Sequence, residues 1–184
     1  MKFTTRAGRR LAVGIGLASA AVLLPTAALA ASAAPNAPAH PAVARCYSAN
    51  TRVWTAAQSD GTAGAVYYQL EFSNIGHSAC TLYGYPGVSA YNVHGHVVGL
   101  PAKHGGPKFL ITLAPGGTAH VVLKVTDAGA VCLHPINITV LRVYPPGQFN
   151  SQLVGFQSQG CANRSTMFVD AMHAGAGIPG YSIH

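Results

Sequence analysis

The clearest pattern along the chain is a strict alternation of apolar and polar side chains between residues 66 and 73. A period of two places successive side chains on opposite faces of a β-strand. The face predicted to be apolar carries Val66, Tyr68, Leu70 and Phe72. The sequence therefore predicts a half-buried strand over residues 65–73, with Glu71 as an isolated acid on its outer face. The Asn74-Ile75-Gly76 segment that follows predicts a turn, because Asn and Gly tolerate positive φ.

A second alternation runs from residue 118 to residue 125, and its predicted inward positions are Ala119, Val121, Leu123 and Val125. Just before it, Pro115-Gly116 fits the two central positions of a type II turn, in which the second residue needs positive φ. Shorter β-prone stretches separated by turn residues cover 46–55, 81–85, 88–93, 96–100, 109–113, 136–143 and 153–156.

About eight short strands at regular spacing, with no long amphipathic helical pattern, are typical of an all-β sandwich or barrel. We predict an immunoglobulin-like antiparallel β-sandwich of about 7–9 strands over residues 45–170. Residues 171–184 are rich in Gly and Ala, and we expect them to form a loosely ordered tail.

The first 30 residues have the composition of a secretory signal peptide. Residues 1–10 are basic, residues 11–30 are uncharged and apolar, and Ala28-Leu29-Ala30 is a small-residue cleavage site. Residues 31–33 offer a second cleavage site, and Arg9-Arg10 leaves the twin-arginine export route open beside the general one. A membrane anchor is the competing interpretation, which the glycines and Pro25 disfavour. We expect a secreted protein of the extracellular space or cell wall, with no membrane span after cleavage.

Residues 31–44 are an Ala- and Pro-rich stretch that predicts a flexible spacer. The formal net charge of +7 overstates the charge of the mature chain, because four of the eleven Lys and Arg residues lie in the signal. The remaining seven, set against four acids, give +3 and are scattered along the sequence. Nucleic-acid binding needs clustered cations, so we expect no nucleic-acid partner.

Four cysteines in an exported chain predict disulfides rather than a metal site, since no C-x-x-C spacing occurs. Three pairings are possible. We favour the sequential one, which joins Cys46 to Cys80 and Cys132 to Cys161. Each bridge would then close a short loop and stabilise the fold by about 3–4 kcal/mol.

Three strings of residues resemble one known family. They are LEFSNIG at 70–76, CTLYGYPG at 80–87 and LAPGGTA at 113–119, accompanied by Cys46, Cys132 and Cys161. In this combination the chain, from Cys46 to about Thr166, resembles the actinobacterial domain of unknown function 4232. The resemblance implies an exported immunoglobulin-like sandwich, often behind an Ala/Pro-rich spacer, and it implies no activity. Many members carry a lipid-anchoring cysteine at the signal site, which this chain lacks.

Histidine is frequent, and His94-Gly95-His96 is its sharpest cluster. Two histidines two residues apart on a strand point to the same side, and His104 or His120 would complete a copper or zinc site. Surface histidines in a turn are the competing interpretation, because Gly95 places the pair in a hairpin.

No catalytic group stands out. The chain has no G-x-S-x-G string and no paired carboxylates, and we predict that it is not an enzyme and needs no cofactor. Five tyrosines are candidates for a binding face, or for ordinary packing on a sheet. They are Tyr67, Tyr83, Tyr85, Tyr91 and Tyr144.

The function that these observations favour is a secreted, non-catalytic binding or structural module of the cell envelope. Its expected partner is an unidentified protein or a cell-wall polymer, and the binding residues are unknown. The alternatives are an extracytoplasmic copper- or zinc-binding protein using His94 and His96, and a secreted protease inhibitor that presents the loop 101–108.

Overall fold

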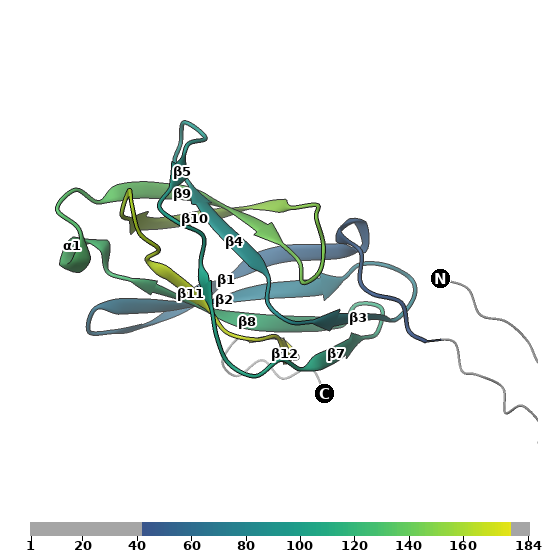
Figure 1. The fold of residues 1–184 in the computed structure, drawn as a ribbon. Coiled ribbons are helices and arrows are strands. Elements are labelled where there is room, and N and C mark those ends of the chain that lie inside the picture. Colours follow the sequence, from purple (N-terminus) through teal and green to yellow (C-terminus); the bar gives the residue numbers. More distant parts are fainter. Residues whose placement is uncertain (1–41, 178–184) are drawn as a thin grey trace, which may run out of the picture. The chain divides into compact units, whose positions relative to one another are not determined.

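The computed structural model describes residues 42–177, and these form an all-β domain (Figure 1). The expected signal peptide of residues 1–30 and nearly all of the spacer lie outside the described residues. Within the described part, no helix is long and apolar enough to cross a membrane. The strands are β1 Thr51–Thr62, β2 Ala65–Asn74, β3 Cys80–Tyr83, β4 Gly87–Tyr91, β5 Val97–Val98, β6 Lys103–His104, β7 Leu110–Leu113, β8 Thr118–Thr126, β9 Ile136–Tyr144, β10 Gln152–Gly160, β11 Met167–Val169 and β12 His173–Ala174. A 3-10 helix, η1 (Ser48–Asn50), precedes β1, and a short helix, α1 (Ala128–Val131), follows β8.

The larger sheet has the strand order β1-β2-β8-β11-β6, and β12 also pairs with β8. Its centre is the antiparallel pair β2–β8, which runs in continuous register from Ala65↔Thr126 to Ser73↔Thr118. These are the two strands that the strongest sequence alternations predict. The edge strand β6 runs parallel to β11, whereas the other pairs in this sheet are antiparallel.

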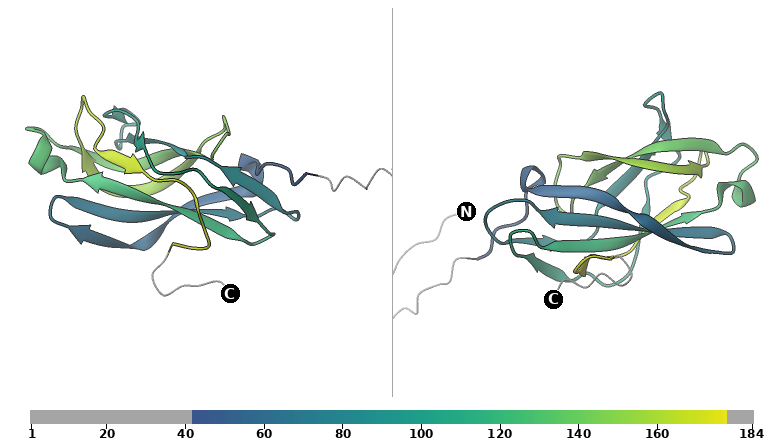
Figure 2. Two further views of the ribbon diagram at one scale, coloured as in Figure 1. Left: turned by 60° about the horizontal axis from the view of Figure 1, so that its bottom comes forward. Right: turned by 180° about the vertical axis from the view of Figure 1, so that it is seen from behind.

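A second, antiparallel sheet has the order β10-β9-β4-β5, and β3 and β7 form a separate two-stranded sheet. Figure 2 shows the two larger sheets as layers, one over the other. Short strands such as β5, β6 and β12 raise the count above the 7–9 expected, because a two-residue pairing leaves no readable period. The all-β, antiparallel class is confirmed, and the immunoglobulin-like topology stays a prediction.

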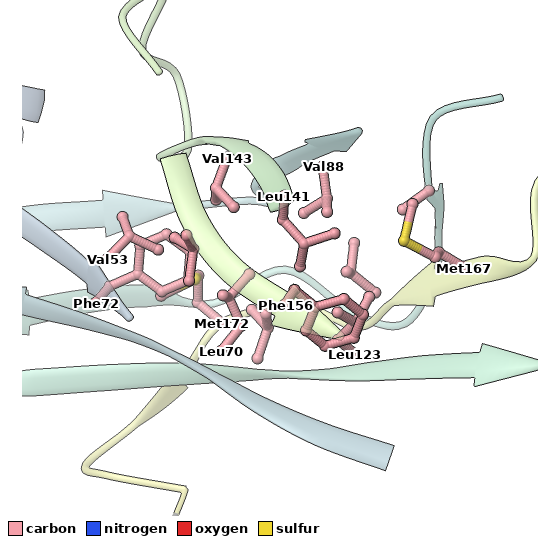
Figure 3. Packing of buried hydrophobic residues seen from close by; sticks show 14 of the residues in the cluster. Val53, Leu70, Phe72, Val88, Leu123, Leu141, Val143, Phe156, Met167 and Met172 are labelled. Carbon is pink, nitrogen blue, oxygen red and sulfur yellow. The ribbon is translucent and has the colours of Figure 1, made fainter. Parts of the chain in front are cut away.

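The hydrophobic core lies between the two layers (Figure 3). Leu70, Phe72 and Leu123 reach into it from the larger sheet, and Leu141 and Phe156 reach into it from the facing sheet. The inward set predicted for β8 is confirmed, since all four of its side chains are buried. Burial of alternate apolar side chains on both sheets removes their surface from water, which is the main stabilising contribution to such a domain.

The loops before β3 and β8 meet at Asn74. The Asn74 amide donates to the backbone carbonyls of Ser78, Leu113 and Ala114, and its oxygen accepts from the Gly76 N–H at 2.9 Å. Asn74 therefore organises the turn through its buried side chain, and Gly76 is not in the left-handed region. The turn expected at Pro115-Gly116 is present, with φ +77° at Gly116.

The cysteines are joined in the sequential pairing, Cys46–Cys80 and Cys132–Cys161. The first bridge attaches the segment before η1 to β3. The second attaches the residue after α1 to the residue after β10. Each disulfide thus fixes a connecting segment against a strand end.

One side chain joins the open edges of the two layers. Gln152 of β10 accepts a hydrogen bond from the Val53 N–H of β1 at 3.0 Å, and its amide group donates to the carbonyls of Ser48 and Thr51. The edge strands β1 and β10 are held together there by a side chain in place of a backbone ladder.

Two expected boundaries need correction. Strand β1 runs from Thr51 to Thr62, well beyond the end of the stretch 46–55 that was expected to be β-prone. The tail expected to be loose from residue 171 is ordered at its start, because Ala171 and Met172 are buried and β12 pairs with β8 through His173↔His120. Met172 is an apolar side chain that enters the core, and its burial carries the chain back onto the sheet.

Candidate functional site

The His94 and His96 pair lies on the exposed hairpin between β4 and β5. Asn92 Oδ1 accepts hydrogen bonds from the backbone N–H groups of His94 and His96, and Gly95 has φ +75°. The imidazole centroids are 6.3 Å apart and the rings are tilted by 43°. Within residues 42–177, no three His, Cys, Asp or Glu side chains are grouped as metal ligands.

The other two histidines that were expected to complete a metal site lie elsewhere. His104 stacks on Tyr85, with ring centroids 5.1 Å apart, and His120 stacks on His173, with centroids 5.3 Å apart. The copper or zinc hypothesis therefore gains no support from the arrangement of these four side chains.

The loop of residues 101–108, which the protease-inhibitor hypothesis would present to a protease, is hydrogen-bonded to the rest of the domain. Ala102 donates its N–H to Val88 O, and Gly105 donates its N–H to Val169 O. The Tyr85 hydroxyl donates to Gly106 O, and β6 within the loop pairs with β11. The backbone of this loop is thus largely engaged with its own domain, which does not favour the inhibitor hypothesis.

A polar cluster covers the outer face of the larger sheet where β2, β8 and β12 meet. Asp170 accepts the Val122 N–H at 2.7 Å and pairs with His173 Nε2 at 3.0 Å. His173 stacks on His120, whose Nδ1 lies 2.9 Å from Gly175 O. Glu71 stands directly opposite His120 in the β2–β8 register.

Glu71 is fully buried, which corrects the expectation of a solvent-facing carboxyl. The segment after β12 folds over it, and Gly177 donates its backbone N–H to Glu71 Oε1 at 2.8 Å. The second oxygen, Oε2, has no hydrogen-bond partner among the described residues. Burial raises the Glu71 pKa to about 7, against a smaller lowering by the Gly177 hydrogen bond.

The cluster has the acid and the imidazoles of a hydrolytic site but not the whole arrangement. A nucleophilic mechanism needs a hydroxyl or thiol within hydrogen-bond distance of the base. Among the described residues, the recorded hydrogen bonds of His120 and His173 go to Gly175 O and Asp170. The cluster therefore orders the chain around β12, and its geometry does not assemble a nucleophile.

The acidic side chains differ from the basic ones in how they are bonded within the domain. All three described carboxylates accept hydrogen bonds from backbone N–H groups: Glu71 from Gly177, Asp127 from Gly129 and Asp170 from Val122. Among the side chains that the structure describes, these acids form one ion pair, which joins Asp170 to His173. These three acids thus serve internal structure, and none of them is paired with a lysine or arginine.

Three of these cations lie over tyrosine rings. The distance from the cation to the ring centroid is 5.2 Å for Lys108 and Tyr85, 5.9 Å for Lys124 and Tyr67, and 4.6 Å for Arg142 and Tyr91. Such pairs hold a long side chain over an aromatic face while its charge stays accessible. Because Tyr67 is on β2 and Tyr91 on β4, the tyrosines belong to different sheets and do not form one binding face.

Sequence reasoning missed two groupings. Glu71 and its cover are 106 positions apart, and no local period encodes that contact. Lys103 and Arg164 line one pocket although they looked scattered in the sequence. The sequence held one signal for the segment that covers Glu71: the apolar pair Ala171-Met172, which is unusual in a loosely ordered tail.

Comparison with known proteins identifies the chain at the level of its family. No curated protein and no solved structure matches it. The model of one family, described as a domain of unknown function, matches residues 46–173, from the first cysteine to the start of β12. The chain therefore belongs to the DUF4232 family.

Proposed function

We propose that this protein is a secreted, non-catalytic module that binds an anionic polymer of the cell envelope. The observation that carries this proposal is the division of charge. The carboxylates of Glu71, Asp127 and Asp170 are hydrogen-bonded within the domain, and none of these three forms an ion pair with a lysine or arginine. A surface with unpaired cations attracts polyanions over distances of about a Debye length.

Two further features support a binding role over a catalytic one. The His120, His173 and Asp170 cluster lacks a hydrogen-bonded nucleophile among the described residues, and two disulfides fix the connecting segments of a β-sandwich. Disulfides and an expected signal peptide suit an oxidising location outside the cytoplasm. A rigid domain that presents cations there is suited to holding a polymer.

The test is retention of the purified mature protein on isolated envelope fragments. We expect retention at low ionic strength and release as salt rises, because screening weakens exposed charge contacts. Envelope fragments extracted to remove their acidic polymers are the matched control and should retain much less. Equal retention on extracted and intact fragments, or full recovery in the soluble fraction at low salt, would contradict the proposal.

A further inference from the structure

A pocket of about 360 Å³ is lined by Lys103 of β6, by Arg164 and Ser165 of the loop between β10 and β11, and by Leu100 and Val131. No carboxylate lines it. The two cations are 61 positions apart in the sequence and converge because β6 and β11 pair side by side, Lys103 opposite Phe168. The pocket thus concentrates positive charge that is spread out along the chain.

A disulfide and a backbone hydrogen bond hold the walls of this pocket in place. Val131 ends α1, and the next residue, Cys132, is bridged to Cys161 at the start of the Arg164 loop. The Arg164 carbonyl accepts the Leu100 N–H at 3.3 Å. Figures 1 and 2 show α1 and the segment leading into β11 at the same end of the domain. Backbone held in this way needs little further ordering when a ligand binds.

The chemistry of the lining defines a class of ligand. Lysine and arginine together are the usual protein partners of phosphate and carboxylate oxygens. Leu100 is 57% exposed and Val131 37% exposed, so the same pocket offers apolar surface to a carbon skeleton. A charged group carried on a sugar or polyol matches both features, because its oxyanion can meet the cations while its carbons contact the apolar side chains.

We propose that the Lys103–Arg164 pocket binds one oxyanion, a phosphate or a carboxylate, together with the sugar or polyol unit that carries it. This inference rests on the proposed function and assigns its binding site. The remaining lysines and arginines then supply general attraction, and this pocket supplies the specific contact.

The test compares two double variants of the full mature protein that remove the same charge. Lys103→Gln/Arg164→Gln removes both cations from the pocket, and Lys124→Gln/Arg142→Gln removes two cations that lie over tyrosines elsewhere. Binding is measured by calorimetry with a glycerol phosphate oligomer, with an oligogalacturonate and with neutral dextran. The first two probes distinguish phosphate from carboxylate, and dextran is the uncharged control.

We expect the pocket variant to bind the preferred anionic oligomer at least about tenfold more weakly than the native protein, and the matched variant to change by about threefold or less. Equal weakening in both variants would overturn the pocket and leave the proposed function in place. Failure of the native protein to bind either anionic oligomer would overturn both proposals.

A second measurement covers the case in which the pocket variant does not fold. In the native protein, titration with the preferred oligomer should shift the backbone amide resonances of Arg164 and Ser165 more than those of Lys124 and Arg142. The reverse order of shifts, or uniform shifts, would also overturn the pocket.

Discussion

At the scale of single residues, polar side chains inside the fold repeatedly form hydrogen bonds with backbone groups that strand pairing leaves without a partner. Asn74 bonds two loops, Gln152 joins two sheet edges, and Glu71 accepts the N–H of a segment more than a hundred positions away. Each of these contacts depends on a buried or half-buried polar group with a fixed partner, and losing such a partner is costly. Stability should therefore respond sharply to changes at these positions.

Glu71→Gln should change how stability depends on pH. The native carboxyl has a pKa near 7 against 4.5 for the unfolded chain, so the native state holds an extra proton between these values. Stability then falls as pH rises from about 4.5 to about 7, by no more than about 3 kcal/mol. Glutamine cannot ionise, and its oxygen can still accept from Gly177.

Urea denaturation from pH 4 to pH 8 provides the measurement. The variant and the native protein should be nearly equal in stability at pH 4.5, and the variant should be the more stable at pH 8. The difference between the two proteins isolates Glu71 from the nearby His120 and His173, which are present in both. A constant difference across this pH range would show that Glu71 ionises normally.

Gln152→Ala should destabilise the domain by about 2 kcal/mol, because it leaves the Val53 N–H and two carbonyls without their partner. Gln157→Ala is the matched control, since Gln157 is exposed on the same strand and should change stability by less than about 0.5 kcal/mol. Thermal and urea unfolding of both variants give the comparison. Similar losses in the two would mean that Gln152 acts through the propensity of β10 and not through its bonds.

At the scale of elements, the long central strands differ from the short edge strands in how firmly their sequence determines them. Strand β8 buries every second side chain over its nine residues, so its own period specifies both its faces. Strand β6 has two residues, both exposed, and its place is determined by β11 and by the loop bonds around it. The connections between these elements therefore carry much of the specificity of the fold.

That difference also explains how far the sequence alone predicts this molecule. The faces of β2 and β8 and the turn at Gly116 follow from contacts between neighbours in sequence. The burial of Glu71 and the meeting of Lys103 with Arg164 follow from segments that return from 106 and 61 positions away. The period of two predicts which face of a strand is apolar. It does not predict which distant segment of the chain covers the other face.

Gly99→Ala tests one such connection. A Cβ at Gly99 would lie 2.4 Å from Arg164 O and 2.7 Å from Cys161 O, and the residue has φ +72°. Gly95→Ala is a matched control, because φ is +75° and no atom lies within 4 Å of its added Cβ. Positive φ alone should cost both variants about 1–2 kcal/mol.

The steric contact should cost Gly99→Ala at least about 1 kcal/mol more than the control, measured by urea denaturation. The same variant should bind the preferred anionic oligomer more weakly, because the Arg164 loop has to move. Equal destabilisation of the two alanine variants would mean that the loop yields freely at Gly99.

At the scale of the whole molecule, the two disulfides brace different parts of the domain. Cys46–Cys80 attaches the amino-terminal segment to β3, whereas Cys132–Cys161 joins α1 to the end of β10 beside the basic pocket. Their loops are of similar length, with sequence separations of 34 and 29, so the chain-entropy contributions should be similar. Their effects on binding should differ.

Replacing either cysteine pair with alanine should lower the unfolding free energy by about 3–4 kcal/mol. Only the Cys132→Ala/Cys161→Ala variant should also weaken binding of the anionic oligomer, since only that bridge fixes a wall of the pocket. Calorimetry at a temperature where both variants remain folded separates the two effects. Equal affinity in the two variants would contradict a role for the second disulfide in binding.

The Gln152 side chain has a consequence for how copies of this protein meet one another. Strand β1 is the outer strand of its sheet, and an outer strand with unused backbone groups is a template on which another chain can add. Gln152 occupies two of those groups, the Val53 N–H and the Thr51 carbonyl, and the register shift between Thr55 and Ser59 interrupts the remainder of the strand. The outer edge of this sheet is in this way protected against edge-to-edge aggregation.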